Sequence, residues 1–137
     1  MPEPRSPFQY ALLRVVPRVD RGECINAGVV LFAPTRPFLG ALVGLDTARL
    51  AALSPDADAE ALRRQLEGIA AVAAGEPDAG PMARLPRSGR FHWLVSPSST
   101  SVQPSAVHTG LCDDPAAMLE SLFERLVRTA AGRAPDR

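Results

Sequence analysis

Residues 18–32, RVDRGECINAGVVLF, decide the fold, because a charged turn leads directly into an apolar run. Asp20 can accept a hydrogen bond from its own backbone and Gly22 can adopt a positive φ, which are both properties of turn residues. A three-residue loop over 19–21 would place Arg18 opposite Gly22 and start a β-hairpin. Residues 23–33 are mostly apolar on both alternating faces, as in a central strand covered on both sides. We therefore expect this strand in the middle of a sheet.

The strand before the turn is FQYALLRVVP, residues 8–17, which also alternates well. Arg14 interrupts one apolar face of this strand, and Asn26 interrupts a face of the next. Counting back from the turn places Arg14 directly opposite Asn26, so the two side chains should share a face. Glu23 would point to the other face, unless a bulge near Gly22 or Gly28 turns it toward Arg14.

Two interpretations of these polar residues stay open. In the first, which we favour, they form a buried network that fixes the register, because a buried Arg must be paired and hydrogen-bonded. It predicts that Arg14 and Asn26 are mostly buried, that Arg14 bonds an acceptor within the protein, and that Glu23 is its nearest carboxylate. In the second, Arg14 binds an anionic ligand group, which Glu23 or Asn26 orients.

The rest of the chain predicts three further strands and three helices. The strands are FLGALVGLD (38–46), RFHWLVS (90–96) and SVQPSAVHTG (101–110), and Pro104 makes the last one an edge or a bend. The helices cover 47–53 after the cap Asp46, 58–74, and a terminal segment after the cap Asp114 that runs to Val127. Residues 75–89 are rich in breakers and should form an exposed connection.

The predicted order is therefore β-β-β-α-α-β-β-α in one domain. Strands in runs, separated from helices, indicate an α+β fold with an antiparallel or mixed sheet of about five strands, packed by two main helices. Residues 1–6 and 130–137 are expected to be frayed.

Composition excludes several classes of protein. The chain has 137 residues, 46% of them hydrophobic and 22% charged, with a net charge of zero, which is typical of a globular domain. It has no apolar run of membrane-spanning length, and its first residues, MPEPRSPFQY, lack a leader pattern, so we expect a cytoplasmic protein. Zero net charge and only one Trp, one Tyr and five Phe disfavour nucleic-acid binding.

Metal and nucleophile chemistry have little support in the sequence. Cys24, His92, His108 and Cys112 are of the types that bind zinc, but they do not form two short-spaced pairs. We expect no metal, no cofactor and no structural disulfide. His108, beside Gly110 in a region rich in Ser and Thr, suits a polar cleft better than His92 does.

Four segments carry a family resemblance: FQYALLRVVP, RGECINAGVVLF, SVQPSAVHTGL and DDPAAMLESLFERLV. They resemble a small bacterial family catalogued as domain of unknown function 3037, over roughly residues 8–128. The resemblance places the family's distinctive polar positions on Arg14, Arg21, Gly22, Glu23, Asn26, Gly28, Gln103, His108 and Gly110, and assigns no activity to them. Relatives can be encoded beside kinase-like proteins of the persistence-toxin type, which implies an accessory role.

The sequence is compatible with two functions. The first is a small cytoplasmic accessory or binding protein that acts through a protein partner, for which the family resemblance implies a kinase-like protein encoded nearby. The alternative is an enzyme or binding domain for a phosphorylated or otherwise anionic small molecule, with Arg14, Glu23, Asn26 and His108 on one side of the sheet. The candidate residues for a ligand site or a polar network are Arg14, Arg21, Glu23, Asn26, Gln103 and His108.

Overall fold

The computed structural model describes residues 5–98 and 100–128 and shows a five-stranded antiparallel sheet. Its strands are β1 (Ser6–Val15), β2 (Ile25–Ala33), β3 (Phe38–Val43), β4 (Val102–Pro104) and β5 (His108–Cys112). The order across the sheet is β3-β2-β1, and both β4 and β5 pair with the free side of β1, one after the other. The predicted α+β fold is confirmed.

Four α-helices and three shorter helical turns make up the remaining elements of the described residues. They are α1 (Thr47–Leu53), α2 (Ala59–Ala74), α3 (Arg87–Leu94), α4 (Pro115–Phe123), the 3-10 turns η1 (Pro77–Ala79) and η2 (Pro81–Arg84), and the π-helical turn η3 (Glu124–Arg128). The side chains of Asp46, Asp58 and Asp114 accept hydrogen bonds from the first turns of α1, α2 and α4. The predicted helix starts follow from this capping chemistry.

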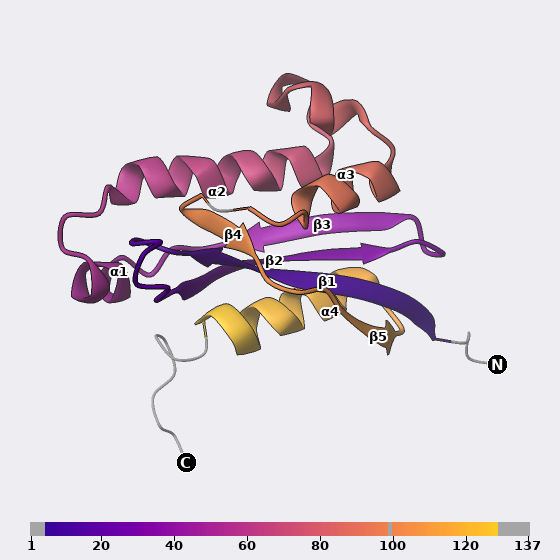
Figure 1. Cartoon of the computed structure of the whole chain (residues 1–137). Helices are drawn as coiled ribbons and strands as arrows, with labels where there is room; N and C mark the ends of the chain where they lie inside the picture. The colour runs from indigo at the N-terminus through magenta and orange to yellow at the C-terminus, as the bar shows by residue number, and fades with distance from the viewer. Residues whose placement is uncertain (1–4, 99, 129–137) are drawn as a thin grey trace, which may run out of the picture.

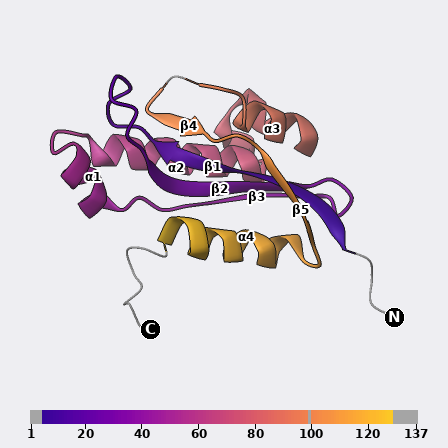
Figure 2. The same cartoon turned by 60° about the horizontal axis from the view of Figure 1, so that its bottom comes forward.

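The molecule has three layers (Figures 1 and 2): α2 and α3 cover one face of the sheet, and α4 covers the other. Two apolar clusters separate the layers. The α2 side buries Leu13, Ile25, Val30 and Leu66, and the α4 side buries Val29, Leu31, Leu119 and Phe123. β2 contributes to both clusters because it lies between β3 and β1 under helices on both faces, as its apolar sequence predicts.

The β1–β2 hairpin has the predicted turn. Gly22 adopts φ +74°, and its N–H donates to the carbonyl oxygen of Arg18 at 3.2 Å. Arg14 pairs with Asn26 as predicted, whereas Leu13 pairs with Gly28, so the register shifts by one residue and Ala27 is extra. Because the bulge reverses the alternation of faces, Ile25 and Ala27 before it and Val30 and Phe32 after it all pack into the α2-side cluster. Asn26 faces α4.

The predicted strand at residues 90–96 is wrong, because residues 90–94 belong to α3 and Val95 caps its C-terminal end. Phe91 and Leu94 lie one helical turn apart, so a helix can bury both against the sheet, and Phe91 stacks on Phe32 with ring centroids 5.2 Å apart. Trp93, which a strand would place on the same face as Phe91, is 46% exposed. Such a short apolar run fits either element, and here tertiary packing selects the helix.

The fifth predicted strand, 101–110, is divided in two by a register shift. β4 ends at Pro104, and β5 begins at His108 and extends to Cys112. Between them the backbone N–H of Ser105 donates to the Leu12 carbonyl oxygen, and the Leu12 N–H donates to Ser105 Oγ, both at 2.8 Å. The Ser105 side chain therefore continues the ladder where the backbone register changes.

The predicted connection over 75–89 contains η1, η2 and the start of α3, and within it Ala83 is buried. Of the ends expected to fray, residues 1–4 and 130–137 lie outside the described part, and Ser6 is buried at the start of β1. None of the helices in the described ranges has both the length and the apolar character needed to cross a bilayer.

Candidate functional site

Three of the predicted site residues form one row across the sheet. Arg14 on β1 pairs with Asn26 on β2 and with Gln103 on β4. Their sequence neighbours Val15, Ile25 and Val102 belong to the α2-side cluster, so alternation directs the three polar side chains to the α4 side. We call Asn26, Arg14 and Gln103 the polar row.

Arg14 has no internal partner in the described part of the chain. The residue is mostly buried, its Nε atom is buried, and no described hydrogen-bond acceptor lies within reach of that atom. The prediction that Arg14 bonds an acceptor within the protein is not met by any described residue, whereas the prediction that Arg14 is mostly buried is confirmed. Because a buried N–H without a partner costs free energy, this arrangement favours an acceptor that comes from outside the chain.

Glu23 is bound by Arg21 at the tip of the hairpin. Arg21 Nε and Nη2 donate to the two carboxylate oxygens of Glu23, each at 2.9 Å, and both side chains are exposed. This bidentate bond lowers the pKa of Glu23 and raises the pKa of Arg21. The bulge at Ala27 therefore does not turn Glu23 to a hydrogen bond with Arg14, which was the condition under which the two could pair.

Asn26 joins the sheet to the end of the chain's last helical segment. Its Nδ2 atom donates to the carbonyl oxygen of Leu126 in η3 at 3.0 Å. Asn26 is mostly buried, as predicted. The polar residue in this apolar strand is thus explained by its hydrogen bond to a carbonyl group of η3.

Gln103 and Arg14 lie on the part of this face that α4 leaves open. α4 packs mainly on β2 and β3, while β1, β4 and β5 extend beyond it (Figure 2). The Nε2 atom of Gln103 donates to the Thr100 carbonyl oxygen at 2.8 Å. The side-chain amides of Asn26 and Gln103 each donate one hydrogen bond within the protein. Arg14 lies between them, and its Nε–H group has no acceptor among the described residues.

His108 lies on the same face but at a distance from the polar row. It pairs with Tyr10, with ring centroids 5.2 Å apart, and it is exposed. Tyr10 precedes Arg14 by four residues along β1, which is roughly 13 Å at the rise of a strand. The set of Arg14, Glu23, Asn26 and His108 that a small-molecule site would need is therefore not brought together.

The described part of the chain holds no group of three His, Cys, Asp or Glu side chains that could bind a metal ion. Cys24 is exposed and Cys112 is buried, both with free thiols, and burial raises the pKa of Cys112. His92 lies exposed on α3.

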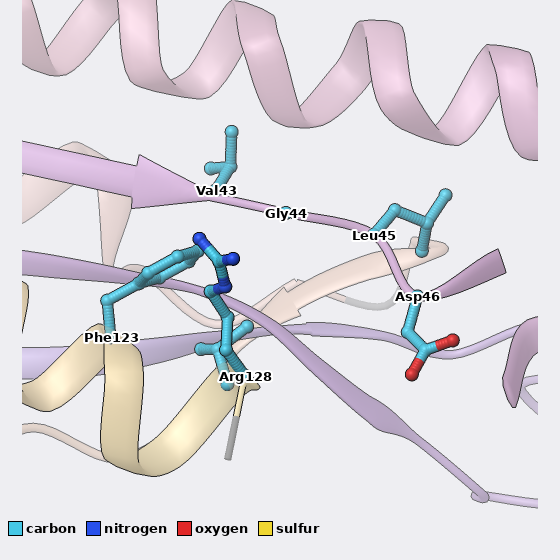
Figure 3. A pocket seen from close by; sticks show the side chains of 7 residues that line it. Val43, Gly44, Leu45, Asp46, Phe123 and Arg128 are labelled. Atoms are coloured by element: carbon cyan, nitrogen blue, oxygen red, sulfur yellow. The ribbon is translucent and has the colours of Figure 1, made fainter. Parts of the chain in front are cut away.

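A pocket of about 350 Å³ lies between the end of β3 and η3 (Figure 3), and no residue of the polar row lines it. Its lining residues are Val43, Gly44, Leu45, Asp46, Phe123, Val127 and Arg128. The Arg128 guanidinium lies 5.9 Å from the centre of the Phe123 ring and 3.6 Å from Glu124, and Asp46 caps α1. Both charges at this pocket already have partners within the chain, so it offers mainly apolar walls.

Two smaller hollows adjoin the exposed Trp93, with volumes of about 330 and 340 Å³, and share Ile69 and Val102. The sequence pattern missed these hollows because it assigned Trp93 to a strand. The sequence pattern also missed the bond between Ser105 and Leu12. The only sequence signal for it is the position of Ser105 directly after Pro104 in a predicted edge strand.

One comparison with known proteins gives a match. The model of a family described as proteins of unknown function, DUF3037, matches residues 10–127. No curated protein and no solved structure matches the chain. The matched range includes every residue of the polar row.

Proposed function

Because the chain belongs to the DUF3037 family of proteins of unknown function, whose description assigns no activity, we propose its function from the polar row. The protein is an accessory domain that binds a partner protein, and Arg14 receives a carboxylate from that partner. The observation that carries this proposal is the Arg14 Nε atom, which is buried without a partner among the described residues.

The chemistry of the row favours a carboxylate. A guanidinium group presents donors in a fixed fork that matches two carboxylate oxygens, and such charge-assisted hydrogen bonds are stronger than neutral ones. Asn26 and Gln103 on either side of Arg14 bring no negative charge into the row. Glu23 is held by Arg21, so this carboxylate does not compete for Arg14.

The open surface around the row favours a protein over a small ligand. Tyr10 and His108 lie farther along the same face of the sheet, and His108 is exposed. A partner that contacts both His108 and Arg14 must span the roughly 13 Å between their places along β1, which an extended segment of protein does easily. Following the family resemblance, the first partner to test is a kinase-like protein encoded nearby in the source genome.

Purification of the tagged chain from its native host tests the proposal. The wild-type chain should retain a partner in constant ratio, and Arg14→Gln should lose it. Arg21→Gln is the matched control, because it also removes one guanidinium but only from the exposed ion pair with Glu23. Recovery of the wild-type chain alone, or equal retention by Arg14→Gln, would contradict the proposal.

A second candidate function is the binding of a phosphorylated or otherwise anionic small molecule at the same guanidinium. It rests on the same buried Arg14 Nε atom, because a small anion needs less room beside that atom than a segment of protein does. Titration of the purified chain with inorganic phosphate and with acetate, followed by the NMR signal of the Arg14 Nε–H group, separates the two. Saturation by phosphate at low concentration would favour this candidate, and no response to either anion would leave the partner as the source of the acceptor.

A further inference from the structure

We propose that the free edge of β3 pairs with β3 of a second copy of this chain, in an antiparallel arrangement with a two-fold axis at Ala41. The two five-stranded sheets would then form one continuous sheet across a homodimer. This inference concerns a different part of the molecule from the polar row and does not depend on it.

β3 has one side of its backbone unpaired. The Gly44 N–H donates to the Ala27 carbonyl oxygen at 2.8 Å, in the same register in which Val43 pairs with Gly28. Because hydrogen-bonded pairs alternate along an antiparallel ladder, Phe38, Gly40 and Leu42 also bond toward β2. The N–H and C=O groups of Leu39, Ala41 and Val43 therefore point to the outer edge. Within the described ranges, no hydrogen bond reaches these outward groups.

The sequence of this edge lacks the features that usually prevent strand addition. Natural proteins protect edge strands with charges, Pro residues, bulges or short length. β3 has the sequence FLGALV, with no charge and no Pro, and all six of its residues pair with β2 without a register shift. A regular, uncharged edge of this kind is suited to pairing with another strand.

The opposite edge of the same sheet is protected. β4 has three residues, β5 has five, and the register on β1 shifts between them. Pro104 lies in β4, and the side chain of Ser105 takes the place of a backbone acceptor. The contrast between the two edges indicates that β3 is the edge available for association.

A two-fold axis at Ala41 gives a self-complementary register. Leu39 of one copy then lies opposite Val43 of the other, and Ala41 lies opposite its own equivalent. These are the residues whose backbone groups point outward, so each outward N–H finds an outward C=O. A two-fold interface of this kind uses the same patch on both copies, which is the commonest symmetry among homo-oligomers.

The charges that flank β3 also suit an antiparallel copy. Arg36, which donates to the carbonyl oxygen of Asp113, precedes the strand, and Asp46, which caps α1, follows it, so each keeps its formal charge next to the strand. Antiparallel pairing brings the end that carries Arg36 in one copy toward the end that carries Asp46 in the other. A parallel arrangement would instead bring like charges together at both ends, which is unfavourable.

The first test measures the mass of the full chain in solution by light scattering. The wild type should be a dimer, and Ala41→Pro should be a monomer, because Pro removes the central outward N–H while the bonds to β2 remain. Ala41→Val is the matched control, since it keeps the N–H group and should stay dimeric. A monomeric wild type at millimolar concentration, or a dimeric Ala41→Pro, would overturn the proposal.

Amide hydrogen exchange of the wild type provides a second test that needs no variant. In the dimer, the amides of Leu39, Ala41 and Val43 should be as protected as those of Gly40 and Leu42. Dilution below the dissociation constant of the dimer should speed hydrogen exchange only at the amides of Leu39, Ala41 and Val43. Fast exchange of these three amides at high concentration would show that the edge is unpaired and would contradict the proposal.

Discussion

Asn26 Nδ2 donates to the carbonyl oxygen of Leu126 at 3.0 Å, which joins the second strand to a segment 100 positions later in the chain. The carbonyl oxygen of Leu126 lies in η3, and Asn26 supplies a donor to it from inside the sheet. The polar residue in β2 thus ties η3 to the sheet.

Replacing Asn26 by Ala should destabilise the protein by about 1–2 kcal/mol, because the Leu126 carbonyl group loses its donor in a half-buried position. Urea unfolding measures the change in free energy. Gln103→Ala is the control, since the bond from Gln103 to Thr100 is exposed, and this variant should lie within about 0.5 kcal/mol of the wild type. Equal effects of the two variants would argue against an anchoring role for Asn26.

Ser105→Ala should destabilise the protein by about 1–3 kcal/mol, because it leaves the buried N–H of Leu12 without an acceptor. The amide of Leu12 should also exchange faster with solvent. Ser98→Ala removes a hydroxyl from an exposed turn and should change the free energy of unfolding by less than about 0.5 kcal/mol. An unchanged exchange rate at Leu12 would show that Ser105 does not complete the ladder.

Gly110→Ala should destabilise the protein by roughly 1–3 kcal/mol, because a Cβ atom there would lie 2.8 Å from the Phe8 ring. Phe8 is buried in the α4-side cluster and cannot move without disturbing its neighbours. Gly68→Ala is the matched control: its Cβ meets nothing within 4 Å on α2, and the change should stabilise the helix by about 0.5–1 kcal/mol. The two substitutions should therefore have opposite signs in thermal unfolding.

The carboxyl group of Glu23 should titrate below its ordinary pKa, because Arg21 donates two hydrogen bonds to the carboxylate. A lowered pKa in the folded state means that the pair stabilises the fold above the unfolded value, about 4.3 for Glu. This contribution is lost as the pH falls through the lowered pKa. Carboxyl NMR titration should show the pKa of Glu23 rising in Arg21→Gln and unchanged in Arg63→Gln, which breaks a distant ion pair. A Glu23 pKa that does not respond to Arg21→Gln would contradict this cause.

Local patterns predicted most of the fold, since alternation, caps and turn residues act over a few positions. The turn at Gly22 and the pairing of Arg14 with Asn26 could be counted along the chain from one loop. The segment 90–96 could not be assigned in this way, because its helix depends on the burial of Phe91 and Leu94 against distant elements.

The residues of the candidate site could be predicted from the sequence, but their pairing and hydrogen-bond partners could not. The sequence pointed to Arg14, Asn26 and Gln103, yet the pairing of Arg14 with Gln103 joins positions 89 apart in the chain, across a sheet edge that contains a register shift. It indicated Glu23 as a partner of Arg14 only if a bulge turned it, and it did not indicate that Arg21 binds Glu23 with two hydrogen bonds. These partners are set by nonlocal packing, which a single sequence does not specify.

The free energy of unfolding of Arg14→Gln tests most directly whether Arg14 serves binding or the fold. A guanidinium group whose Nε atom lacks an internal partner contributes little to stability, so the variant should lie within about 0.5 kcal/mol of the wild type in urea unfolding. A loss of about 3 kcal/mol or more would show instead that Arg14 belongs to a buried pair on which the fold depends, and would contradict the account.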